Sequence, residues 1–255
     1  MEFNQIGHYW YSGMFIEPSF WIGSLIFCFI AYIIGSINSA QILSIAGSKN
    51  IGETGSRNFG ATNAGRAYGV KGFVFVFLFD MLKAVFVAII LTMIATKGTF
   101  DLNSIDPNYL FAYASIPGAI VFVIIGHSFP IFFGFKGGKG VATAFGSIIV
   151  LNWIFAIIAI SVFLLTIKYM RWVSLGSIFG TIVGSMLVCF AHPFLYTTCP
   201  NLFFYWTFNW ISSISSLFVC LFVIVRHRSN IIRIYQGKDP LIKPKGYVPS
   251  DVIKQ

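Results

Sequence analysis

Two glycine-rich stretches carry the residues best suited to chemistry. Residues 47–66 place Ser, Arg, Asn and Thr side chains between glycines, and residues 134–143 read Gly-Phe-Lys-Gly-Gly-Lys-Gly-Val-Ala-Thr. Glycine lets the backbone approach a ligand closely, and N–H groups beside basic side chains and a helix start are suited to holding phosphate. A flexible basic loop at the lipid surface is the alternative for each stretch. Two such stretches on one membrane face favour anion sites over loops that only connect helices.

The second stretch does not match a nucleotide-binding loop. A Walker A loop requires Gly, four residues, and then Gly-Lys followed by Ser or Thr, whereas Lys139 is followed by Gly140. No dinucleotide fingerprint leads into a βαβ pattern either. The sequence therefore argues against nucleotide hydrolysis.

Ionisable residues within or beside apolar runs are further candidates. Asp80 and Lys83 lie one helical turn apart, so they can pair. Ionisable groups inside a membrane are functional candidates by default, but we interpret this pair as structural support for the adjacent loop. His127 precedes Ser-Phe-Pro, and both a hydrogen-bonded helix-ending histidine and a catalytic one remain open.

A basic segment follows the last apolar run directly. Residues 226–233 read Arg-His-Arg-Ser-Asn-Ile-Ile-Arg, so His227, Asn230 and Arg233 have helical spacings of three. These three side chains would share one helix face, which either lines the site or faces away from it. Arg226 and Arg228 also suit ordinary anchoring at the membrane interface.

Cysteine and histidine spacing indicates neither a metal site nor a disulfide framework. The four cysteines (Cys28, Cys189, Cys199 and Cys220) form no Cys-x-x-Cys pair, and the histidines are scattered. We expect no metal and no cofactor.

The composition indicates an integral membrane protein. Of the 255 residues, 57% are hydrophobic and 10% charged, against roughly 45–50% and 25% in ordinary soluble domains. The net charge of +9 arises mainly in a few short stretches. Such clusters reflect membrane topology, so nucleic-acid binding is not expected.

Long apolar runs predict the membrane-spanning segments. Each is near the ~20 residues that cross a bilayer core, and they cover residues 20–43, 72–95, 110–133, 141–167, 173–191 and 203–225. Most Lys and Arg residues fall in the stretches 44–71, 134–140, 168–171 and 226–255. Because basic loops stay cytoplasmic, the N-terminus should lie outside and the C-terminus inside.

The run at residues 141–167 must then cross twice or dip and return. It reaches only about 40 Å as a helix, too short for two crossings of roughly 30 Å. We infer an uneven pair of helices that turns near Asn152. The first of them starts just after the second glycine-rich stretch, residues 134–140, which we call the glycine loop. The fold expected is all-α and polytopic, with seven transmembrane helices, one of them short. The chain would form a single membrane domain (1–255), with an external extension (1–19), a transmembrane core (20–225) and a cytoplasmic tail (226–255).

Six motifs occur together in one order. They are Gly35-Ser-Ile37, Gly55-Ser56-Arg57-Asn58-Phe-Gly60-Ala-Thr-Asn63-Ala-Gly-Arg66, Asp80-x-x-Lys83, Gly126-His127-x-Phe-Pro130, Phe135-Lys-Gly-Gly-Lys-Gly-Val-Ala-Thr143 and Arg226-His227-Arg-x-Asn230-Ile-x-Arg233. This series resembles the bacterial acyl-phosphate:glycerol-3-phosphate acyltransferases (PlsY) over about residues 35–237. The resemblance implies transfer of a fatty acyl group from acyl phosphate to the 1-hydroxyl of sn-glycerol 3-phosphate, giving lysophosphatidic acid and phosphate in phospholipid biosynthesis.

The resemblance also implies residue roles. The loop around acyl phosphate would be Gly137, Gly138, Lys139, Gly140, Val141, Ala142 and Thr143. Glycerol 3-phosphate would be held by Ser56, Asn58, Asn63, Arg66, Lys139, His227 and Asn230, with Ser56, Arg66, Lys139 and His227 as the catalytic set. Asp80, Lys83 and His127 would support them. The expected partners are acyl phosphate, glycerol 3-phosphate, membrane lipids and an enzyme supplying acyl phosphate, at the cytoplasmic face of a bacterial plasma membrane.

Four positions depart from the family pattern. Asn50-Ile51-Gly52 replaces Asp-x-Arg, and Arg57 replaces the second glycine of Gly-Ser-Gly-Asn. Asn38 replaces the proline after Gly-Ser-Ile. One positive charge has thus moved along the first loop.

An acyl phosphate is a mixed anhydride with a good leaving group, so direct attack by the glycerol hydroxyl needs no covalent intermediate. No His–carboxylate pair is apparent in the sequence, which favours a substrate phosphate over His227 as the base. The His-x4-Asp dyad of thioester-dependent glycerolipid acyltransferases is absent. The alternative function is a transporter or flippase for an organic phosphate, although the expected outer loops are almost free of basic charge.

Overall fold

The computed structural model describes residues 18–97, 112, 115–191 and 202–241, and within them no side chain of 19, 20, 191 or 202–209. All but the last two residues of the expected outer extension (1–19) and much of the tail therefore lie outside the described residues, as does Cys199. The helices are α2 (Pro18–Gly35), α3 (Ser39–Ala46), η1 (Ile51–Glu53), α4 (Ala61–Ala95), α6 (Ile116–Ser128), η4 (Ile131–Phe133), α7 (Val141–Leu151), α8 (Trp153–Met170), α9 (Val173–Met186), η5 (Leu187–Ala191), α11 (Leu202–Arg226) and α12 (Arg228–Tyr235). The all-α expectation is confirmed for these residues, in which a single bridge between Trp172 and Leu241 is the only β pairing.

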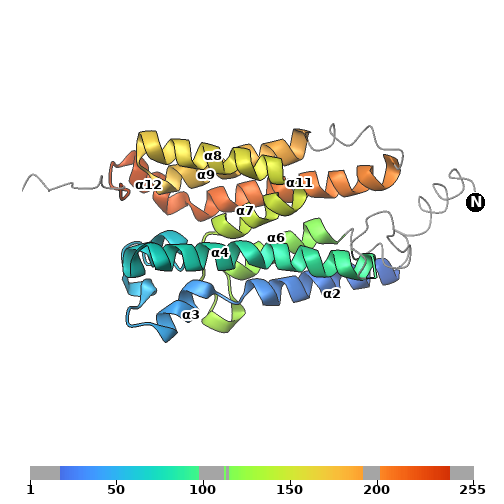
Figure 1. Cartoon of the computed structure of the whole chain (residues 1–255), viewed down its shortest axis with the longest axis horizontal. Coiled ribbons are helices and arrows are strands. Elements are labelled where there is room, and N and C mark those ends of the chain that lie inside the picture. Colours follow the sequence, from blue (N-terminus) through green and yellow to red (C-terminus); the bar gives the residue numbers. More distant parts are fainter. Residues whose placement is uncertain (1–17, 98–111, 113–114, 192–201, 242–255) are drawn as a thin grey trace, which may run out of the picture.

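The long helices run nearly parallel to one axis of the molecule (Figure 1). In this view α8, α9 and α11 form one group and α2, α4 and α6 the other, with α7 between them. Helix α7 packs against α4, α8 and α9, α2 packs against α6, and α8 packs against α9. The short helix therefore joins the two groups near the centre of the bundle.

Apolar side chains cover the outside of the bundle. Leu25 and Phe29 on α2, Leu164 on α8 and Leu221 on α11 are each more than half exposed. In water such a surface would be costly, whereas hydrocarbon solvates it. Among the described residues five helices are long and apolar enough to cross a membrane, or six if the bent pair of α11 and α12 is one span. The expectation of seven spans stays a prediction.

The structure confirms the break near Asn152. Helix α7 ends at Leu151, and the Asn152 side chain accepts hydrogen bonds from the Ile154 and Phe155 N–H groups at 3.0 and 3.3 Å. Asparagine is a preferred N-cap because its side-chain oxygen satisfies N–H groups that lack a partner within the helix. One polar residue thus ends a short helix and starts a full-length one.

Two helix boundaries differ from the sequence expectation. The run at 20–43 is interrupted after Gly35, and Asn38 caps α3 by accepting from the Gln41 N–H at 3.0 Å. Helix α4 begins at Ala61, well before residue 72, although Gly69 has a φ of 70° and kinks it. The last six residues of the first glycine-rich stretch (61–66) are therefore helical, and the side chains of Asn63 and Arg66 project from a helix.

Candidate functional site

A cavity of about 100 Å³ lies among the start of α4, the glycine loop, α9 and the region where α11 meets α12. It is lined by Ser56, Asn58, Gly60, Ala61, Thr62, Asn63, Arg66, Phe73, Phe77, Asp80, His127, Lys139, Gly140, Val141, Ala142, Phe163, Val173, Ser174, Ser177, His227, Asn230, Arg233 and Pro240. All seven residues predicted to hold glycerol 3-phosphate are among them. Of the residues predicted to surround acyl phosphate, Gly137, Gly138 and Thr143 are not, and neither is the supporting Lys83.

Asn63 orders the first polar stretch. Its amide donates to the carbonyl oxygens of Ile51 and Thr54, both at 2.8 Å, and accepts from the Ser56 N–H at 3.1 Å. The buried Asn63 side chain on α4 thereby fixes the loop that brings Ser56 to the cavity wall. Both amide hydrogens of Asn63 are donated within the protein. Asn63 therefore acts by positioning Ser56.

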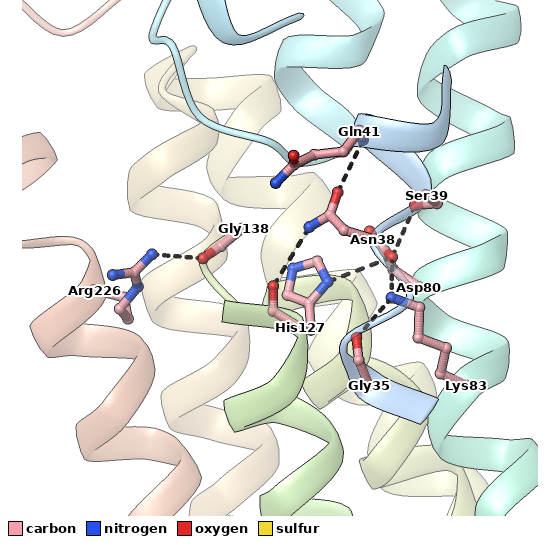
Figure 2. Close-up of polar contacts among 9 residues, drawn as sticks. All are labelled: Gly35, Asn38, Ser39, Gln41, Asp80, Lys83, His127, Gly138 and Arg226. Atoms are coloured by element: carbon pink, nitrogen blue, oxygen red, sulfur yellow. Dashed lines mark hydrogen bonds and ion pairs between the residues drawn. The ribbon is translucent and has the colours of Figure 1, made fainter. Parts of the chain in front are cut away.

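The glycine loop is fixed between the ends of α6 and α11. The Gly138 N–H donates to the His127 carbonyl at 3.2 Å, and Arg226 donates to the Gly138 carbonyl at 2.8 Å. Figure 2 shows this carbonyl turned toward Arg226. The Arg226 guanidinium also lies 4.8 Å from the centre of the Phe129 ring, a favourable cation–π distance. Arg226 therefore positions the loop instead of lining the cavity.

The loop ends at the start of α7. Gly140 has a φ of 83°, a left-handed conformation that suits glycine, and it provides no side-chain cap. The first N–H groups of a helix lack partners within it and carry partial positive charge. Because Gly140, Val141 and Ala142 line the cavity, this helix start is suited to an anion bound there.

A buried polar network lies behind the loop. Asp80 Oδ1 is 2.8 Å from both Lys83 Nζ and Ser39 Oγ, and 3.4 Å from His127 Nδ1. Figure 2 shows these groups converging on the Asp80 carboxylate from α3, α4 and α6. The predicted pairing of Asp80 with Lys83 is confirmed. The sequence shows no His–carboxylate pair, and the structure corrects this interpretation because the packing of α4 against α6 brings His127 beside Asp80.

The network also reaches α2 and the glycine loop. Lys83 Nζ donates to the Gly35 carbonyl at 3.3 Å, and Asn38 Nδ2 donates to the His127 carbonyl at 3.5 Å. The ring of His127 contacts Gly138. Asn38, at the position of the family's proline, thus contributes a bond that proline cannot make.

The basic segment at residues 226–233 contributes another wall of the cavity through His227, Asn230 and Arg233. His227 is the N-cap residue of α12, and its Nδ1 lies 2.8 Å from the Val223 carbonyl. A carbonyl only accepts, so Nδ1 carries the proton and Nε2 keeps a lone pair in the neutral ring. Asn230 accepts a hydrogen bond from Lys139 Nζ and donates to Ser174 Oγ and, at 3.0 Å, to Asp239 Oδ1.

The cavity holds an excess of positive charge. The pKa of Lys139 is lowered to about 8, first by burial and then by the nearby Arg233 charge, whereas Asp239 opposes this shift. Burial also lowers the pKa of His227 to about 4, with a further contribution from the Lys139 charge. His227 is therefore neutral at pH 7, and Lys139 is mostly charged. An anion in this cavity would reduce the repulsion among its basic groups.

An apolar groove adjoins the cavity. It is lined by Phe77, Val141, Phe145, Ile148, Ala159, Ile160, Phe163, Ser177, Gly180 and Thr181, from α4, α7, α8 and α9. Phe77, Val141, Phe163 and Ser177 line the groove and the cavity. The site therefore combines a basic end with an apolar extension along the helices.

Sequence reasoning missed Asp239, Ser174 and the phenylalanines that line the cavity, which are Phe73, Phe77 and Phe163. Asp239 is the lone acidic residue between Arg226 and Leu241. This place among basic residues could have marked it as a candidate site residue. Ser174 and Phe163 carried no such signal, because their place in the cavity depends on how α8 and α9 pack.

Comparisons with known proteins agree on one family. A family model described as "Glycerol-3-phosphate acyltransferase" matches residues 25–237. Proteins of that name from Listeria monocytogenes and Staphylococcus carnosus are 38% and 35% identical, cover 87% and 84% of this chain, and are themselves covered over 98% and 95% of their lengths.

Solved structures give the same result. A crystal structure of PlsY (YgiH), described as an integral membrane glycerol 3-phosphate acyltransferase in its glycerol 3-phosphate form, aligns with a TM-score of 0.67 and 28% identity. The alignment covers 91% of this chain and 100% of that one. The lysophosphatidic acid form of PlsY aligns with a TM-score of 0.66 and 29% identity, covering 87% of this chain and 96% of that one.

Proposed function

Because the chain belongs to the glycerol-3-phosphate acyltransferase family, we propose that it transfers a fatty acyl group from acyl phosphate to the 1-hydroxyl of sn-glycerol 3-phosphate. The products would be lysophosphatidic acid and inorganic phosphate. Family membership makes the chain an integral membrane acyltransferase and favours an enzyme over a transporter or flippase. The acyl donor, the product and the residue roles are the parts that we propose.

The observation that carries the proposal is one basic cavity continuous with one apolar groove. Arg66, Lys139 and Arg233 line the cavity beside the uncapped start of α7, and such a set of donors suits phosphate. The groove shares Phe77, Val141 and Phe163 with the cavity. An acyl phosphate has an anionic head and an apolar tail, so it fits this arrangement with its carbonyl carbon at the junction.

Within the cavity we assign the two phosphates to different donors. Gly140, Val141 and Ala142 would hold the acyl phosphate head with backbone N–H groups, and Gly137, Gly138 and Thr143 would shape that loop. Ser56, Asn58, Arg66, Lys139, His227 and Asn230 would hold glycerol 3-phosphate. Asn63 contributes by positioning Ser56, in line with its three hydrogen bonds.

The proposed chemistry is one displacement at the acyl carbon. The glycerol oxygen forms a bond to the carbonyl carbon, the bond from that carbon to the phosphate oxygen breaks, and the hydroxyl proton passes to a phosphate oxygen. His227 has a pKa of about 4, whereas the dianion of a phosphate monoester takes up a proton near pH 6. The substrate is therefore the better base, and His227 Nε2 would orient the glycerol by accepting a hydrogen bond from its other hydroxyl.

Charge distribution supports an active site at the cytoplasmic face. The turn between α8 and α9, the start of α4 and helix α12 lie at one end of the bundle in Figure 1, opposite the start of α2. This end carries Lys168, Arg171, Arg66 and Arg233, and basic ends of membrane proteins stay inside. We propose seven spans in a bacterial plasma membrane, with α7 as the short one and the N-terminus outside. Cys199 should then react with an impermeant thiol reagent from outside only.

The reaction is tested with purified protein in detergent. Phosphate release from palmitoyl phosphate should require glycerol 3-phosphate and yield lysophosphatidic acid, and palmitoyl-CoA should not replace the donor. Lys139→Ala and Arg66→Ala should abolish turnover in folded protein. Lys136→Ala is the matched control, because it removes the same charge from an exposed side chain of the same loop. Near-normal rates in either site variant, or turnover with the thioester alone, would contradict the proposal.

A further inference from the structure

Asp239 is a carboxylate buried in a basic part of the molecule. Its residue is 4% exposed and follows α12 in the segment 236–241. The N–H groups of Lys238 and Asp239 donate to the Arg233 carbonyl at 2.7 and 3.2 Å, which folds the segment back onto α12. The bridge between Trp172 and Leu241 then joins it to the start of α9. The segment is therefore fixed at both ends beside the cavity, which Pro240 lines.

The Asp239 carboxylate contacts two residues of the cavity wall. Its Oδ1 accepts from Asn230 Nδ2 at 3.0 Å and from Arg233 Nε at 3.2 Å. Both Asn230 and Arg233 line the cavity, whereas Asp239 does not. Its influence on a bound substrate would thus pass through these two side chains.

The contact with Asn230 determines which edge of the amide faces Lys139. An asparagine amide donates from one edge and accepts at the other. The carboxylate of Asp239 and the hydroxyl of Ser174 take the donating edge, so the carbonyl edge is left to accept from Lys139 Nζ. Without the carboxylate only the Ser174 hydroxyl would hold the amide in this orientation, and in the rotated amide the NH₂ group would repel the ammonium group of Lys139.

Asp239 also balances charge in the cavity. Its charge acts on Arg66 on α4, Lys139 in the glycine loop, His227 after α11 and Arg233 on α12. Arg226 at the end of α11 also acts on Lys139 and His227. The negative charge of Asp239 raises the pKa of Lys139 and opposes the lowering caused by Arg233 and Arg226. Removing that charge would lower the pKa of Lys139, so the side chain would become neutral at a lower pH.

We propose that Asp239 is a positioning residue of the glycerol 3-phosphate subsite, which orients Asn230 toward Lys139 and holds the Arg233 guanidinium at the cavity wall. This inference rests on the function proposed above. Its rival is a purely structural role, in which Asp239 only ties residues 236–241 to α12. The two differ because a structural tie changes how much protein folds, whereas a positioning residue changes the kinetic constants of each folded molecule.

The test compares Asp239→Asn with Asp239→Glu and with the wild type, using the full chain in detergent. Asparagine keeps the size of the side chain and removes its charge. Glutamate keeps the charge on a longer side chain. The matched control is Glu53→Gln, which removes one carboxylate from an exposed residue that does not line the cavity. Folded protein is measured by size exclusion and thermal unfolding, and kcat, KM for glycerol 3-phosphate and the pH profile are measured per folded molecule.

We expect Asp239→Asn to raise the KM for glycerol 3-phosphate about tenfold, because charge-assisted hydrogen bonds to a bound anion lose their alignment. The fall of kcat/KM at alkaline pH (its alkaline limb), which we expect from the loss of the Lys139 charge, should also move to lower pH. Asp239→Glu should restore the position of that limb, and Glu53→Gln should match the wild type within about twofold.

Wild-type KM and an unmoved alkaline limb in folded Asp239→Asn would overturn the inference. So would a lower yield of folded protein whose kinetic constants per molecule are those of the wild type, because that is the structural role. Failure of the proposed function is distinguishable, since the wild type and Glu53→Gln would then release no phosphate in response to glycerol 3-phosphate.

Discussion

The imidazole of His127 occupies the space into which a side chain at Gly138 would project. A Cβ atom placed on Gly138 would lie closer than 3.0 Å to His127 Nε2 and also to the Phe59 carbonyl oxygen. His127 cannot move aside freely, because it is buried and its Nδ1 lies 3.4 Å from Asp80. The glycine loop therefore packs directly on the buried network, so its position depends on how His127 is held by Asp80.

Gly138→Ala should accordingly shift the loop without unfolding the bundle. We expect kcat/KM to fall by about 100-fold or more, since an ångström of misplacement at a reacting centre costs about that much. Thermal unfolding of the purified protein should change little. Gly134→Ala is the control in the same loop, because Gly134 has open space around it and only its φ of 60° opposes a side chain. Wild-type activity in Gly138→Ala would show that the loop adapts.

The buried pair of Asp80 and Lys83 should be more important to stability than to the chemical step. Removing one member leaves an unpaired charge among apolar helices, at a cost of about 3–5 kcal/mol. Asp80→Asn and Lys83→Met should therefore each lower the unfolding temperature strongly.

The double variant measures how far the two residues act as a pair. Asp80→Asn combined with Lys83→Met should cost less than the sum of the single changes, because no charge is left unpaired. Lys71→Met is the control for losing one lysine, since Lys71 is an exposed residue on the same helix. Additive effects would mean that the pairing at 2.8 Å contributes nothing of its own.

Lys139 should give the enzyme an alkaline limit. Its pKa of about 8 means that the free protein loses this positive charge as the pH rises through that value. Binding of a phosphate should raise the pKa again, because an adjacent anion favours the charged form. We expect kcat/KM to fall above pH 8 and kcat to fall only at higher pH.

Lys139→Arg separates this effect from general alkaline inactivation. Arginine stays charged throughout this range, so the variant should be slower but show no alkaline limb near pH 8. Lys136→Ala, in contrast, should keep the wild-type profile. A limb that persists in Lys139→Arg would assign the titration to another group.

Elements set by local patterns were predictable from the sequence, and contacts across the bundle were not. The break at Asn152 follows from run length and charge, because 141–167 is too short for two crossings and the basic residues after it must stay inside. The early start of α4 was missed because glycine and asparagine at its first turns are weak helix formers, and the tertiary contacts of Asn63 and Ala64 stabilise that turn instead. The contact between Asp80 and His127 depends on how α4 packs against α6, which no local spacing encodes.

Arg57 offers a test of a departure from the family motif. It replaces a glycine and has a φ of 56°, a left-handed conformation that costs other residues roughly 1–2 kcal/mol. Its exposed side chain does not line the cavity. Arg57→Gly should therefore relieve this strain and raise the unfolding free energy by up to about 1 kcal/mol, since the flexibility of glycine in the unfolded chain offsets part of the gain.

The KM for glycerol 3-phosphate should show whether the Arg57 side chain contacts the substrate or only occupies the surface. If the arginine only occupies the surface, Arg57→Gly should keep its KM for glycerol 3-phosphate within about twofold, as surface substitutions usually do. Arg57→Ala is the matched variant, because it removes the same charge and keeps the left-handed strain of a residue with a Cβ. A rise in KM shared by both variants would show that the displaced charge attracts the phosphate, and a lower stability of Arg57→Gly would show that the arginine makes contacts worth more than the strain.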